Sequence, residues 1–191
     1  AGRPHSLWYL AGAPGAGAAP SSGIRGAVVN ATTTGQLPFT NPGAGNSYLA
    51  RFQGMGTTAG TLMLCDRIWA NSGISATTIT LQAFTASAQI GSRDNTGTNS
   101  GVGVYGGLEV SVATGAGTPT LTLEYTNSAG TPTKSGVSID LAVATSAVGS
   151  FYRFGLATGD VGIQKATGIT LSATWTAGTI HVILYRVLAR I

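Results

Sequence analysis

Residues 120–126 read Thr-Leu-Thr-Leu-Glu-Tyr-Thr, an alternation of polar and apolar side chains with a period of two residues. Successive side chains of an extended strand point to opposite faces, so this stretch predicts a strand with one buried and one solvated face. The same alternation predicts strands over 78–83, 108–112 and 137–143. Half-buried strands are typical of antiparallel sheets, and the sequence therefore favours an all-β fold.

Turn-forming clusters rich in glycine and asparagine separate these stretches, for example Asn95-Thr-Gly97 and Asn127-Ser-Ala-Gly130. Short strands divided by such turns at intervals of roughly 8 to 13 residues indicate a β-sandwich or a β-barrel. Gly, Thr or Ser interrupts every window that could form an amphipathic helix. We predict a single antiparallel β-sandwich over residues 24–191, with a jelly-roll-like topology.

Two segments, 61–69 and 179–188, are apolar on both faces. This pattern is typical of central strands covered on both sides, or of strands that face another subunit. Within the first segment Asp66 and Arg67 point to opposite faces. Asp66 then shares its face with apolar neighbours and needs a partner, because an unpaired buried carboxylate is costly. We predict that it accepts hydrogen bonds from an arginine or from backbone amides at an interface; the alternative is that it lies in solvent beyond the sheet edge. The interface candidates from these segments are Asp66, Arg67, Tyr185 and Arg186.

The first 23 residues differ from the remainder of the chain. Residues 11–23 contain only Ala, Gly, Pro and Ser, and no side chain among them is large enough to build a core. The apolar stretch Leu7-Trp8-Tyr9-Leu10 precedes them. We predict an extended N-terminal arm over residues 1–23 whose apolar tip either docks on a neighbouring subunit or forms a first strand of the same domain. Its interface candidates are Leu7, Trp8, Tyr9 and Leu10.

Composition narrows the function classes. The 191 residues include ten Lys and Arg and six Asp and Glu, so 8% of the chain is charged, with a formal net charge of +4. Globular chains usually carry about 25% charged residues. The basic residues are scattered and form no stripe, so nucleic acid is not an expected partner. No run approaches the roughly 18 apolar residues of a membrane helix, so a membrane is not expected either.

The single cysteine and the N-terminus bear on the compartment. One Cys excludes a disulfide framework, and Cys65 lies in an apolar run that predicts a buried, inert thiol. The N-terminus lacks the pattern of a signal peptide. We therefore expect a protein made in a reducing cytoplasm.

The motifs for chemistry are weak. Residues 101–106 match G-x-G-x-x-G, but a strand pattern follows where dinucleotide binding needs a helix, so they predict a glycine-rich strand start. His181 lies in an apolar strand, where we expect a core or interface histidine with its hydrogen bonds satisfied rather than a catalytic base.

Clustered zinc ligands are lacking. Residues 94–99 are interpreted first as a turn and second as a weak cation-binding loop. Three carboxylates are expected to be solvated charges on outer strand faces: Glu109, Glu124 and Asp140. We expect no enzymatic activity, no catalytic residue, no metal and no cofactor.

Five segments resemble structural proteins of tailed double-stranded-DNA bacteriophages: 48–52, 61–69, 71–75, 124–131 and 159–164. The resemblance implies a non-enzymatic virion component, of the capsid decoration or cement type, that is made in the host cytoplasm. It further implies a homo-oligomer, as a trimer or dimer, with the major capsid protein as partner. A charge-poor surface suits such a role, because hydroxyl and methyl groups cost less to desolvate than ionised groups.

Two alternatives stay open at this point. The first is another virion part, namely a tail, neck or fibre module. The second is a carbohydrate-binding β-sandwich, which would need exposed aromatic rings; Trp69 and Trp175 are its candidates, although both fit inward strand positions.

Overall fold

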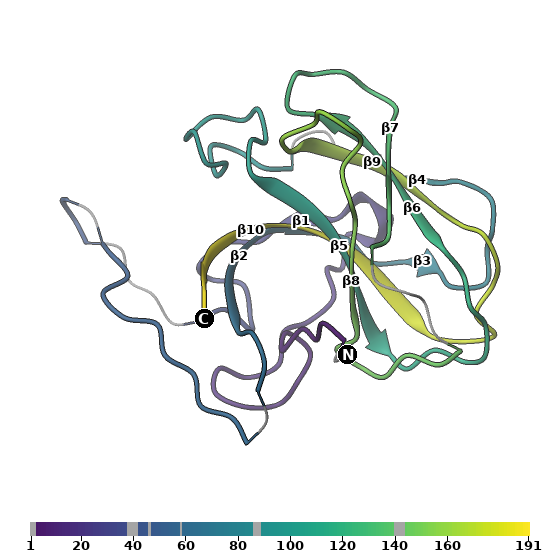
Figure 1. Ribbon diagram of the computed structural model, residues 1–191, viewed down its shortest axis with the longest axis horizontal. Helices are drawn as coiled ribbons and strands as arrows, with labels where there is room; N and C mark the ends of the chain where they lie inside the picture. The colour runs from purple at the N-terminus through teal and green to yellow at the C-terminus, as the bar shows by residue number, and fades with distance from the viewer. Residues whose placement is uncertain (1–2, 38–41, 46, 58, 86–88, 140–143) are drawn as a thin grey trace.

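Two antiparallel sheets face each other across an apolar core, and the chain is an all-β sandwich (Figure 1). The computed structural model describes residues 3–37, 42–45, 47–57, 59–85, 89–139 and 144–191. The first sheet has the order β1-β2-β10-β5-β8, with β3 also paired to β10. Its strands are β1 (Ala27–Val28), β2 (Met63–Ala70), β3 (Ile74–Ser75), β5 (Val104–Val112), β8 (Phe151–Arg153) and β10 (Thr179–Arg190).

The second sheet has the order β4-β9-β6-β7. Its strands are β4 (Gln82–Ala83), β6 (Leu121–Asn127), β7 (Lys134–Val137) and β9 (Ile163–Leu171). A 3-10 turn, η1 (Gly23–Arg25), precedes β1. The jelly-roll topology stays a prediction. Within the described residues, no helix is long and apolar enough to cross a membrane.

The alternation of polar and apolar side chains over residues 120–126 sets the inner face of β6. Leu121, Leu123 and Tyr125 are fully buried in the core between the sheets, while the intervening side chains are partly exposed. The two segments that are apolar on both faces form β2 and β10, which pair with each other in the middle of the first sheet. Trp69 and Trp175 are both buried, as their inward positions predicted.

Two predicted strands are shorter in the structure. In place of a strand over 78–83, only β4 forms, and Ile79 and Leu81 are each about half exposed. The Gln82 side chain closes this segment into a local loop, because it accepts from Ser75 N (2.8 Å) and donates to Ser75 O (2.9 Å). In place of a strand over 137–143, β7 covers Lys134–Val137, and residues 140–143 lie outside the described part of the chain.

A bulge in β2 decides which side chains face outward. Tyr185 of β10 lies opposite Arg67 and Leu184 lies opposite Trp69, so Ile68 is an extra residue in β2. Ile68 and Trp69 therefore both reach the core between the sheets. Arg67 is left on the outer face of the first sheet, beside Tyr185.

Residues 3–35 are called the N-terminal segment below; they include β1 at the edge of the first sheet, and Trp8 near their start packs on the outer face of that sheet. The amide of Ser6 donates to Gly149 O at 2.7 Å, and His5 forms an isolated bridge with Ser150 next to β8. Val29 donates its amide to Ile68 O at 2.8 Å, which anchors the other end of the segment on β2. The tip of the predicted arm thus packs on its own chain, although it forms no named strand.

Candidate functional site

Polar side chains are buried on the outer face of the first sheet, beneath the N-terminal segment. Arg67 of β2 and Glu109 of β5 form an ion pair through Nη1 and Oε2, and the two side chains are only 7% and 2% exposed. Ser6 of the N-terminal segment donates its hydroxyl to the other oxygen, Glu109 Oε1. A buried carboxylate is tolerated only with such partners, so the segment completes the environment of Glu109.

Two aromatic residues of the N-terminal segment cover this ion pair. The indole ring of Trp8 lies over the guanidinium of Arg67, with 4.3 Å between Arg67 Cζ and the ring centroid. Such a cation–π contact is favourable in a desolvated site. The ring of Tyr9 lies 5.3 Å from the ring of His181. Burial raises the pKa of Tyr9 to about 12, although the nearby Arg67 charge acts in the opposite direction.

His181 of β10 is fully buried, and both of its ring nitrogens have partners. Nδ1 donates to the carbonyl oxygen of Asn71 at 3.0 Å, because a carbonyl can only accept. Nε2 then accepts from the Ser111 hydroxyl at 2.6 Å. Burial lowers the pKa of His181 and keeps the imidazole neutral. The arrangement matches the predicted satisfied histidine, and it ties β5, β10 and the turn after β2 together.

A second ion cluster lies on the other side of β2, around Asp66. Asp66 Oδ1 accepts from Arg93 Nη2, and Asp66 Oδ2 accepts from Arg186 Nη2 at 3.2 Å. The two arginines also donate to carbonyl oxygens, Arg93 to Val29 O and Arg186 to Asp94 O. The arginine partner expected for Asp66 is therefore found within the same chain.

The predicted turn around residue 94 is built on the buried carboxylate of Asp94. Its oxygens accept from backbone amides and hydroxyls of the same loop, at distances of 2.7 to 2.9 Å. These hydrogen bonds lower the pKa of Asp94 even though burial opposes them. The donors are Thr96, Thr98, Ser100 and Gly101.

The remaining interface candidates divide between surface and interior. Leu7 and Leu10 stay on the surface, 66% and 37% exposed, while Trp8 and Tyr9 between them turn onto the sheet. Tyr185 is buried, 5% exposed, in the apolar cluster beneath the N-terminal segment.

The prediction for Glu109 was wrong. The alternation in β5 places Glu109 on the outer face, but this face is covered by the N-terminal segment and the side chain is 2% exposed. One signal in the sequence could have found this position. Arg67 lies in a segment that is apolar on both faces, and a buried arginine needs a carboxylate partner such as Glu109. Glu124 is partly exposed and accepts from Thr167 Oγ1 at 3.0 Å, and Asp140 lies outside the described residues.

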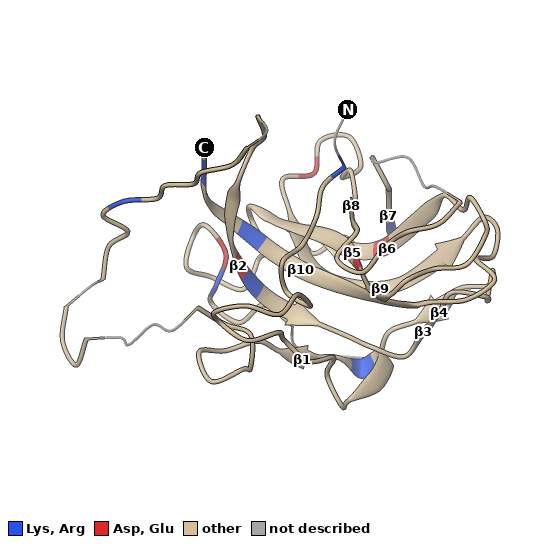
Figure 2. Cartoon of the chain, turned by 90° about the horizontal axis from the view of Figure 1, so that it is seen from below, with Lys and Arg blue, Asp and Glu red and all other residues tan. Residues whose placement is uncertain are grey.

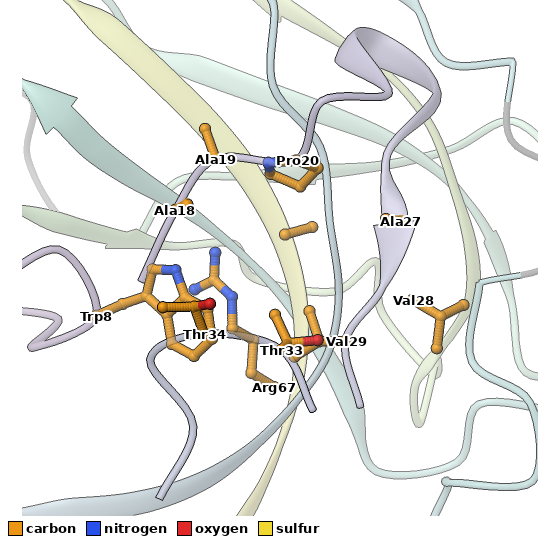
Figure 3. A pocket seen from close by; sticks show the side chains of 11 residues that line it. Trp8, Ala18, Ala19, Pro20, Ala27, Val28, Val29, Thr33, Thr34 and Arg67 are labelled. Atoms are coloured by element: carbon orange, nitrogen blue, oxygen red, sulfur yellow. The ribbon is translucent and has the colours of Figure 1, made fainter. Parts of the chain in front are cut away.

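A cavity of about 180 Å³ lies between the N-terminal segment and β2 (Figure 3). Its walls are mostly apolar, and Arg67 and Trp8 stand side by side at one end of it. Sequence patterns could not predict this cavity, because its walls come from separate parts of the N-terminal segment and from β2, which only the folded chain brings together. The apolar wall residues are Ala18, Ala19, Pro20, Ala27, Val28, Val29 and Ala70.

A different surface is formed by residues 47–57, called the projecting segment below. It leaves the sandwich before β2 and extends away from both sheets (Figures 1 and 2). Every residue in it except Phe52 is exposed, and none belongs to a strand. Its large apolar side chains include Leu49, 56% exposed, and Met55, 95% exposed.

Comparisons of the chain with protein-family models, with curated proteins and with solved structures give no match. The fold and the placement of the chain's own side chains are therefore the grounds for inferring its function.

Proposed function

We propose that this chain is a non-enzymatic structural protein of a virion, which decorates or cements a phage capsid by bridging neighbouring major capsid subunits. The observation that carries the proposal is the projecting segment. Leu49 and Met55 are exposed, and the chain's own core makes no use of them. Exposed apolar side chains gathered on one feature mark an interaction surface.

The distribution of charge supports the same role. Of the ten Lys and Arg and six Asp and Glu, three are buried, namely Arg67, Asp94 and Glu109, and three more are partly buried in the ion cluster around Asp66, which leaves the surface poorer in charge than the composition alone indicates (Figure 2). A surface of Thr, Ser, Gly and Ala loses little on desolvation and can be covered by neighbours over a large area.

In this role the protein acts by binding free energy alone. A protein that binds the closed shell and bridges its subunits stabilises that state by mass action. The shell gains resistance to heat and to internal pressure, and no bond is made or broken. Self-association into a trimer or dimer would place several projecting segments around one axis, where each could reach a different capsid subunit.

The experiment is a count of copies per particle. Particles from the source that encodes this chain are purified, and the chain is quantified against the major capsid protein by mass spectrometry with isotope-labelled peptides. Hundreds of copies per particle are expected for a shell position. A dozen copies or fewer would instead support a tail, neck or fibre module, and absence from purified particles would contradict a virion role altogether.

A further inference from the structure

One buried charged group has donors without partners, and it borders the cavity beneath the N-terminal segment. The side chain of Arg67 is 7% exposed, and its Nη1 donates to Glu109. Its Nε and Nη2 have no hydrogen-bond partner within the described part of the chain. Leaving a buried donor unpaired is costly, and more so when the donor is charged, so these N–H groups call for an acceptor.

The planar shape of the guanidinium determines the direction from which an acceptor can approach. Arg67 Cζ lies 4.3 Å from the centroid of the Trp8 ring, and because the N–H bonds lie in the plane of the guanidinium, an acceptor must approach its edge. The Nε–Nη2 edge of a guanidinium is a two-donor fork that suits an oxygen acceptor. The Tyr9 hydroxyl lies beside the Arg67 guanidinium, whose charge and N–H groups both lower the pKa of Tyr9 against the effect of burial, yet no hydrogen-bond partner lies within 3.5 Å of this hydroxyl in the described residues.

The cavity determines the size and polarity of what can bind. A cavity of about 150 Å³ has room for a benzene ring, and this one measures about 180 Å³ and is open to solvent beside the exposed residues Ala18 and Ala19. Its apolar walls include Pro20, Val29 and Ala70, so a compact apolar body fits against them (Figure 3). Arg67 is already neutralised by Glu109, and a bound carboxylate would add a second negative charge beside that residue. A neutral carbonyl supplies the acceptor without this charge.

We propose that the cavity is a binding site for a small neutral carbonyl compound with an apolar body about the size of a benzene ring. The carbonyl oxygen accepts from Arg67 Nε and Nη2, and the apolar body lies against Pro20, Val29 and Ala70. The site is independent of the role proposed above, because the projecting segment takes no part in it.

The test uses the full-length, isotope-labelled protein and three probes of one shape: acetophenone, ethylbenzene and benzoate. Binding is followed by NMR at the Arg67 Nε–H and Trp8 Nε1–H resonances. Saturable shifts are expected with acetophenone, with at least about tenfold weaker binding of ethylbenzene, since a site built around polar donors rejects an analogue that lacks the acceptor. Equal affinity for ethylbenzene would overturn the role of Arg67. Tighter binding of benzoate would overturn the neutral ligand class, and no binding by any probe would mean that ordered water alone occupies the cavity.

Matched variants localise the effect. Ala18→Leu adds bulk to the wall of the cavity, and Ala16→Leu adds the same bulk to the same segment at an exposed position outside the lining. Acetophenone affinity should fall more than tenfold in the first variant and stay unchanged in the second. Thr33→Phe, which narrows the cavity from another wall, gives the same readout if Ala18→Leu does not fold. Unchanged affinity in either folded cavity variant would overturn the site.

Discussion

At the scale of single residues, His181 makes the stability of the fold depend on pH. Burial lowers its folded-state pKa, while an unfolded chain binds this proton at about pH 6.5. Below that pH the unfolded state therefore holds more protons than the native state. The free energy of unfolding should fall as the pH drops from about 7 to 5, by at most about 1.4 kcal/mol per pH unit for this one group. Urea unfolding across this range measures the slope.

Two variants separate His181 from the other titrating groups. His181→Gln should be less stable at pH 8 by about 1–3 kcal/mol, because it disturbs two buried hydrogen bonds, and its unfolding free energy should depend less on pH between 7 and 5. His5→Gln removes the exposed histidine and serves as the matched control for the loss of a histidine side chain. An undiminished slope in His181→Gln would assign the pH dependence to other groups.

Cys65 should react slowly with thiol reagents in the native state. Burial raises its pKa to about 11, and the charges of Asp66 and Glu109 act in the same direction. Only the thiolate reacts, and at pH 8 about one such thiol in a thousand is ionised. Labelling by iodoacetamide at pH 8 should be at least about a hundredfold slower in the folded protein than in urea. Equal rates would show that the thiol is not held in this environment.

Glu109 shows where residue-by-residue prediction stops. The alternation in β5 correctly gave its side of the strand, since a period of two residues is a local property of extended chain. Whether that side meets water depends on a segment about a hundred residues earlier in the chain, which the alternation cannot report. Asp66 was more tractable, because a carboxylate among apolar neighbours requires a partner wherever that partner lies in the sequence.

At the scale of elements, the N-terminal segment is a structural cover for the first sheet. Trp8→Ala removes the ring that lies over Arg67 and partly uncovers the ion pair with Glu109. We expect a loss of about 2–4 kcal/mol in unfolding free energy, at or below the usual range for a buried Trp→Ala change because Trp8 is only half buried. Chemical unfolding followed by circular dichroism measures this loss.

The neighbouring residue provides the control for Trp8. Leu7 is 66% exposed, and Leu7→Ala should change the stability by less than about 0.5 kcal/mol. Deleting residues 1–23 should leave the sandwich folded but less stable, because its main core lies between the sheets and not beneath this segment. Equal stability of Trp8→Ala and Leu7→Ala would show that the segment does not cover the sheet in solution.

The length of a strand was harder to predict than its existence. The alternation over residues 120–126 correctly predicted a full strand, because β7 and β9 on either side of β6 are long enough to pair with it. Around residue 80 the same alternation produced only β4, because the Gln82 side chain satisfies backbone groups that a longer strand would have paired. A hydrophobic pattern reports which face a residue would take, whereas pairing depends on where a partner strand ends.

At the scale of the whole molecule, several charged side chains are buried while large apolar side chains such as Leu49 and Met55 are exposed. An ordinary soluble domain places its charges on the surface, where they keep it soluble. Here both internal ion clusters hold parts of the chain that are distant in sequence, namely β2 with β5 and β2 with β10. The composition predicted a surface suited to being covered, but it could not show that the exposed apolar side chains include those of the projecting segment.

The projecting segment should therefore be needed for attachment and not for folding. Leu49→Lys with Met55→Lys places two charges where burial at an interface would require their desolvation, while the free chain keeps both side chains in water. The unfolding free energy should change by less than about 0.5 kcal/mol for each substitution. Occupancy on purified particles, measured by quantitative mass spectrometry, should fall at least about tenfold.

A matched pair on another surface shows whether added charge alone lowers occupancy. Ile79 and Leu81 are also about half exposed, but they lie beside β4 on the second sheet. The variant Ile79→Lys with Leu81→Lys adds the same two charges and should keep the wild-type occupancy. If the two double variants lost occupancy equally, general charge repulsion would explain the loss, and the projecting segment would have no special part in binding. Chemical unfolding of both double variants checks that their folded stability is equal, and a difference in occupancy between two equally stable variants belongs to the surface that carries the charges.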